Sequence, residues 1–89
     1  MKQKAAKKGK ILKEFGTNLA RLIREKGYRS RDAFLKQTDL EIYKADLHYM
    51  IKGERDPQMT TLYKIAEALE IGVGELLPEY DPKEKKTKS

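Results

Sequence analysis

Cysteine and tryptophan are absent from this 89-residue sequence, and histidine and valine each occur once. Without cysteine there is no disulfide, no catalytic thiolate and no cysteine-ligated zinc site. No apolar run of about 18 residues exists, and no apolar segment follows the N-terminal lysines, so the sequence predicts neither a transmembrane helix nor a secretory signal. We therefore expect a cytoplasmic protein that has no membrane partner.

The sequence also contains few of the residue patterns that enzymes use. No Ser-His-Asp or Cys-His arrangement is recognisable, and Gly72-Val73-Gly74 lacks the length and the following lysine of a phosphate-binding loop. His48 has no second histidine or glutamate at the helical spacing of metal ligands. We predict that the chain is not an enzyme and binds neither a metal ion nor a cofactor.

Positive charge is concentrated at the two ends of the chain, whose formal net charge is +6. Residues 1–10 carry five lysines and no acid, and residues 83–89 carry four lysines and one glutamate. Between them, residues 11–52 hold nine basic and six acidic side chains, whereas residues 53–82 hold two basic and seven acidic ones. A charge asymmetry of this kind in the body, flanked by basic ends, favours a nucleic-acid partner.

Apolar residues in the first half recur at intervals of three and four, the period of one helix face. They predict a helix over about residues 10–26, ended by Gly27, and a short helix over residues 31–38, capped by Ser30. The expected inward face of the first helix consists of Ile11, Phe15, Leu19, Leu22 and Ile23.

The second half predicts three further helices. Leu47, Met50 and Ile51 mark the buried stripe of a helix that ends at Gly53, and Leu40 and Tyr43 are candidates to extend that stripe. Asp56-Pro57 is a start signal for a fourth helix, whose inward face holds Leu62, Ile65, Ala66 and Leu69. A last short helix contains Leu76 and Leu77 and ends at Pro78.

No stretch alternates with the period of two that marks a strand, and no Asn-Gly or Asp-Gly hairpin turn is present. We therefore predict an all-α fold class. The expected architecture is a compact five-helix domain over residues 11–80, between a disordered basic arm, residues 1–10, and a disordered basic tail, residues 81–89.

The most specific pattern combines Gly53-Glu54-Arg55-Asp56-Pro57 with the helix Thr61-Leu62-Tyr63-Lys64-Ile65-Ala66-Glu67-Ala68-Leu69. This pattern resembles the helix-turn-helix domain of the lambda-repressor and Cro-like (XRE-type) family of DNA-binding proteins. The resemblance spans about residues 15–78. It implies a lambda-repressor-like fold whose third helix enters the major groove of double-stranded DNA.

The resemblance also implies base contacts. The positions of the third helix that match the family's base-reading positions are Lys44, Ala45 and Tyr49, with Asp46 and His48 beside them. Lys44 can donate to guanine, Ala45 can touch a thymine methyl group, and Asp46 can accept from a cytosine amino group. For Asp46, local hydrogen bonding or pairing with a nearby lysine is the alternative.

Phosphate contacts are expected near the ends of the second and third helices, because a helix N-terminus with flanking guanidinium groups suits an anion. The candidate residues are Arg24, Arg29, Ser30, Arg31, Lys52 and Arg55. For each of them, a solvated surface side chain is the alternative.

The sequence departs from the family pattern at two places, one within the third helix and one in the segment before it. Ile51 stands where the family often has an acid that pairs with an arginine of the first helix, which leaves Arg24 without that partner. The segment from Gln37 to Ile42 is about two residues longer than the pattern and lacks its small residue and glycine. The sequence therefore predicts either a lengthened turn or an earlier start of the third helix.

Four apolar residues that follow the fourth helix are candidates for joining two copies of the chain, because a palindromic operator needs two. They are Ile71, Leu76, Leu77 and Tyr80. The alternative is that these residues close the core of their own chain.

The sequence thus predicts a transcriptional regulator that binds an operator as a homodimer. The alternative is a protein-interaction module, such as an antitoxin or adaptor, that keeps the fold without reading DNA. Phage repressors, restriction-modification controllers and antitoxins share this domain, and the sequence does not separate them or identify a protein partner.

Overall fold

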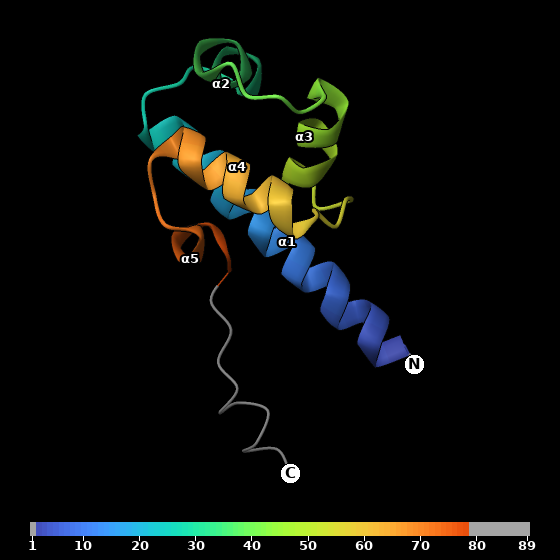
Figure 1. Ribbon diagram of the computed structural model, residues 1–89. Coiled ribbons are helices and arrows are strands. Elements are labelled where there is room, and N and C mark those ends of the chain that lie inside the picture. Colours follow the sequence, from blue (N-terminus) through green and yellow to red (C-terminus); the bar gives the residue numbers. More distant parts are fainter. Residues whose placement is uncertain (1, 79–89) are drawn as a thin grey trace.

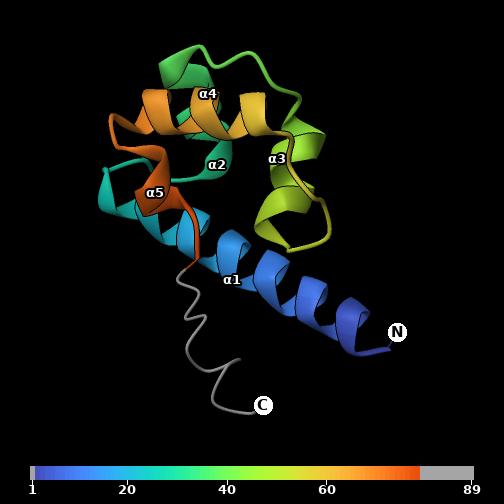
Figure 2. The ribbon, with the colours of Figure 1, turned by 60° about the horizontal axis from the view of Figure 1, so that its bottom comes forward.

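The computed structural model describes residues 2–78, and side chains from residue 9 onward. This part of the chain holds five helices and no strand: α1 (Lys2–Glu25), α2 (Arg31–Thr38), α3 (Lys44–Ile51), α4 (Met59–Leu69) and α5 (Val73–Leu76). The other helices gather beside the C-terminal half of α1, whose N-terminal end projects past them (Figures 1 and 2). The predicted all-α, five-helix fold is confirmed, while Tyr80 and the C-terminal tail lie outside the described residues.

One core is built from all five helices, which is how short helices bury their apolar faces in a domain of this size. α1 packs against α2, α3 and α5, and α4 packs against α5. The buried side chains are Phe15, Leu19, Leu22 and Ile23 of α1, Phe34 of α2, Leu47 and Met50 of α3, Ile65, Ala66 and Leu69 of α4, and Leu76 of α5. Helical spacing therefore predicted most of the core correctly.

Two residues expected in the apolar stripes are instead exposed. Ile11 is 42% exposed because it lies eight residues before Leu19, which rotates it roughly 80° away on a helix of 3.6 residues per turn. Leu12, seven residues before Leu19, lies closer to the phase of the buried face and is half-buried. Tyr43 is 80% exposed because it precedes α3 as its N-cap, in an extended conformation outside the helical phase.

α1 begins at Lys2, about eight residues before the expected start, so the basic arm is helical from residue 2 where we expected disorder. The segment contains lysine, glutamine and alanine, which are strong helix formers, and only Gly9 has low helix propensity. A helix already formed over residues 10–25 also removes the unfavourable nucleation step for the residues before it.

The connection between α2 and α3 is a lengthened turn over residues 39–43, and α3 does not start early. Asp39 ends α2 in the left-handed conformation, with φ 56° and ψ 35°. Aspartate is among the few residues other than glycine that visit this region. Asp39 thus replaces the turn glycine that the family pattern has and this sequence lacks.

α4 begins at Met59, so Asp56-Pro57 does not form its N-cap as predicted. Gln58 is the N-cap and is extended, with φ −75° and ψ 155°. Proline disfavours helical backbone in the residue before it, and residues 54–58 form a connection without regular secondary structure from α3 to α4. At the other end of α4, α5 is tied to α1 because the amide of Asn18 donates to the carbonyl oxygens of Glu75 and Leu76, each at 2.9 Å.

The C-terminal end of α3 crosses α1 at very short range. A Cβ atom added at Gly16 would lie 2.7 Å from the carbonyl oxygen of Met50 and closer still to that of Ile51. Gly53, at φ 78°, ends α3 as predicted, and a Cβ there would lie 2.8 Å from the Cα of Lys13. These two glycines let the backbones of the two helices meet.

We expect Gly16→Ala to destabilise the fold, because backbone atoms of α3 must move to admit the methyl group. The expected loss in the free energy of unfolding, measured by urea denaturation, is about 1–3 kcal/mol. Gly9→Ala is the matched control: it lies in the same helix, nothing stands within 4 Å of its added Cβ, and we expect a gain of about 0.5–1 kcal/mol. Equal effects of the two substitutions would contradict the close crossing.

Candidate nucleic-acid interface

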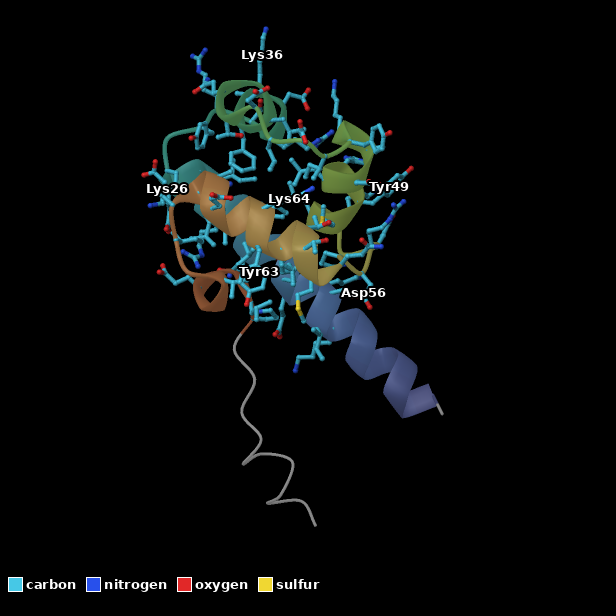
Figure 3. The ribbon with its side chains drawn as sticks, viewed as in Figure 1. Lys26, Lys36, Tyr49, Asp56, Tyr63 and Lys64 are labelled. Carbon is cyan, nitrogen blue, oxygen red and sulfur yellow. The ribbon has the colours of Figure 1, made fainter. Side chains whose placement is uncertain are left out.

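One face of α3 packs into the core, and the opposite face is exposed to solvent. Leu47 and Met50 are fully buried in the core. The side chains of Lys44, Ala45 and Tyr49 are exposed. In Figure 3, Tyr49 points outward from α3, on the side of the molecule opposite Lys26 at the end of α1. The predicted base-reading positions therefore lie on an open surface.

The N-terminal ends of α2 and α3 lie side by side. The Nζ atom of Lys44, the first residue of α3, is 3.3 Å from a carboxylate oxygen of Asp32 in the first turn of α2. The other oxygen of Asp32 is 3.9 Å from the Nε atom of Arg31. The structure thus brings Arg31 and Lys44, predicted for a phosphate and for a base, to one edge around a shared aspartate.

Ser30 is confirmed as the N-cap of α2. Its hydroxyl oxygen accepts a hydrogen bond from the amide of Ala33 at 3.1 Å, which satisfies one of the donors that a helix start leaves open. Ser30 and its neighbour Arg29 are exposed. Both therefore lie at the same edge as Arg31.

A second group of side chains covers the middle of the α3 surface. The Nη1 atom of Arg55, from the connection to α4, donates to Oδ1 of Asp46 at 2.6 Å. The guanidinium carbon of Arg55 lies 5.5 Å from the centre of the Tyr49 ring, and that ring meets His48 edge-on at 5.1 Å. His48 is half-buried. The expected local pairing of Asp46 exists, and its partner is Arg55 instead of a lysine.

Sequence reasoning missed this group because Asp46 and Arg55 are nine residues apart and separated by the end of α3. No helical or strand period relates the two positions.

Lys52, just after α3, is also paired with an acid: its Nζ atom lies 3.9 Å from a carboxylate oxygen of Glu54. Four of the predicted contact cations are thus paired with carboxylates of their own chain.

Arg24 is the predicted phosphate contact that the structure does not bring to this surface. It lies exposed in the last turn of α1. That end of α1 carries Lys26, which is remote from Tyr49 in Figure 3. Arg24 is therefore separate from the other predicted phosphate contacts.

The predicted dimerisation residues differ in where they lie. Leu76 is fully buried and closes the core of its own chain, so its side chain is not available to a second copy. Ile71 is half-buried against the core, and Leu77 is 42% exposed. Tyr80 lies outside the described residues. Leu77 therefore remains as the exposed apolar side chain of this set among residues 9–78.

Within the part of the chain that the structure describes, no group of three or more histidine or acidic residues could hold a metal ion. No helix of that part combines the length and apolar character that a membrane crossing needs.

Comparisons with known proteins agree with this geometry. A family model described as the Cro/C1-type HTH DNA-binding domain matches residues 18–82. The chain is 35% identical over 66 residues to the uncharacterized HTH-type transcriptional regulator y4dJ of Sinorhizobium fredii, an alignment that covers 74% of this chain and 82% of that protein. No solved structure matches the chain. The matching family model and the paired helices α2 and α3 show that the chain belongs to the Cro/C1-type helix-turn-helix family of DNA-binding domains.

Proposed function

We propose that the chain is a sequence-specific transcriptional regulator that binds an operator as a dimer, with α3 in the major groove. The observation that carries this proposal is the shared edge of α2 and α3, where the Lys44–Asp32 ion pair joins their N-terminal ends. An α-helix fits the major groove, and side chains at its start reach base edges while the preceding helix contacts phosphates. Lys44, Ala45 and Tyr49 are exposed where such contacts are needed.

The internal ion pairs are compatible with this function because they are weak. The side chains of the pairs Lys44–Asp32 and Lys52–Glu54 are each half-exposed or more. Exposed pairs of this kind contribute about 0–1 kcal/mol to stability. A guanine acceptor can therefore replace the carboxylate beside Lys44, and a phosphate the one beside Lys52, at small cost.

The same pairs favour a second candidate function. Arg31, Lys44, Lys52 and Arg55 all have carboxylates nearby, which leaves little excess positive charge on the surface around α3. A protein-interaction module that keeps the fold without reading DNA would have such a surface. Selection of enriched sequences from random duplexes at low salt distinguishes the two, because the regulator enriches a sequence and the module does not.

Substitutions should separate base contacts from phosphate contacts. We expect Lys44→Ala and Tyr49→Ala each to reduce discrimination between the selected site and random duplex by about 1–3 kcal/mol. Arg31→Ala and Lys52→Ala should weaken binding to all sequences to a similar extent. Titrations of both duplexes measure the difference, and equal losses for Lys44→Ala would give Lys44 a positioning role only.

The basic start of α1 should add affinity without specificity. It carries five lysines, and each lysine that neutralises a phosphate contributes about −0.9 to the slope of log affinity against log salt. Deletion of residues 1–9 removes four of them, so the slope should flatten by about two units per protomer if half of these touch phosphate and by almost four if all do. The ranking of sequences should stay unchanged.

The control for this deletion keeps the charge and weakens the helix, through Ala5→Gly together with Ala6→Gly. We expect this variant to retain most of the slope. A full slope after deletion would make the arm merely solubilising. Loss of sequence preference would instead indicate that the arm reads the minor groove, which basic arms usually do through arginine.

We propose that Leu77, with Ile71 and Tyr80, joins two copies of the chain. Leu77→Glu should then produce a monomer in sedimentation experiments, because a charge would be buried at the contact. Tyr63→Glu, at an exposed position on α4, is the control and should leave the dimer intact. A monomer of the unaltered chain at high concentration, even with DNA present, would contradict the proposal.

A further inference from the structure

Arg55 occupies an unusual position for a side chain of the connection between α3 and α4. Its guanidinium group lies against the exposed surface of α3, between Asp46 and Tyr49. Asp46 and Tyr49 are three residues apart and therefore neighbours on one face of the helix. The hydrogen bond to Asp46 holds the guanidinium group at one end, and the Tyr49 ring lies below its central carbon at cation–π distance.

This arrangement leaves part of the guanidinium group available to a ligand. Arginine has five N–H donors, and Asp46 engages Nη1 alone among the hydrogen bonds that Arg55 makes in the described structure. The Arg55 side chain is 48% exposed. Because Asp46 and Tyr49 already restrict its conformations, binding would cost it less side-chain entropy than a free arginine loses.

The planar fork of donors of an arginine, placed here at the exposed surface of α3, matches the O6 and N7 acceptors of guanine in the major groove. We propose that Arg55 reads a guanine, that Asp46 is its positioning residue, and that Tyr49 supports its plane. The proposal rests on the proposed function and replaces the phosphate contact that the family resemblance implies for Arg55.

The charge of Asp46 favours a base contact over a phosphate contact. A carboxylate 2.6 Å from the guanidinium group offsets the positive charge that would attract the DNA backbone. It also repels phosphates of every sequence equally. The same carboxylate improves recognition of a base, because the donors then point in a defined direction, and geometry decides a bidentate contact.

The test compares affinities for the site selected by the unaltered protein and for random duplex. Asp46→Ala removes a negative charge, so random affinity should rise, whereas affinity for the selected site should fall. We expect the ratio of the two to fall about 10- to 100-fold. Arg55→Lys keeps the charge but loses the fork, so the ratio should fall similarly while random affinity stays unchanged.

Glu54→Ala is the matched control, because it removes a carboxylate that pairs with Lys52 in the same segment. Both affinities should rise equally in this variant. A direct readout is 7-deazaguanine, which lacks the N7 acceptor. At one guanine of the selected site it should weaken binding of the unaltered protein and have no effect on Arg55→Lys.

Two results overturn the inference while the regulator function stands: full discrimination in Arg55→Lys, or an equal rise of both affinities in Asp46→Ala. A third result is distinct from these. If the unaltered protein enriches no sequence at all, the proposed function fails and the inference fails with it.

Discussion

The close crossing of α1 and α3 at Gly16 is the constraint on which the interface depends. Because the Gly16 backbone leaves room for the carbonyl oxygens of Met50 and Ile51, the end of α3 is fixed against the longest helix of the domain. Leu47 and Met50 fix the rotation of α3 about its own axis by entering the core. Together they determine which side chains of α3 point outward, so a packing requirement in α1 determines the exposed surface that we propose for DNA binding.

Most of the fold could be predicted from the sequence because its signals are local. Helical spacing identified the buried faces, and Ser30, Gly27 and Gly53 marked helix ends where the structure has them. Prediction failed where more distant parts of the chain decide. Asp56-Pro57 is a local start signal, yet α4 begins only after Gln58, which is extended. Leu76 was a candidate for the contact between two copies, yet its side chain is fully buried. Asn18 of α1 donates a hydrogen bond to its carbonyl oxygen and so holds the end of α5 against α1.

The candidate site was predictable in its positions and not in its partners. The family resemblance placed Lys44, Ala45 and Tyr49 on α3, and the structure leaves all three exposed. The carboxylates that accompany the basic residues follow no period, because Asp32 and Lys44 lie on different helices and Arg55 belongs to a connection. Ion pairs between elements become visible only when the elements are placed in space.

The basic residues around α3 have acidic neighbours, whereas those at the N-terminal end of the chain do not. Around α3, nearby acids reduce the excess positive charge, which weakens long-range attraction to phosphates. The five lysines of residues 1–10 have no acid within that segment, and the family model begins only at Asn18. Attraction to phosphates depends on charge number and salt, whereas base reading depends on direction. Because these two requirements fall in separate segments, the proposed function implies that each can change without the other: a substitution in the N-terminal segment would alter how strongly DNA is held, and one on α3 would alter which sequence is held.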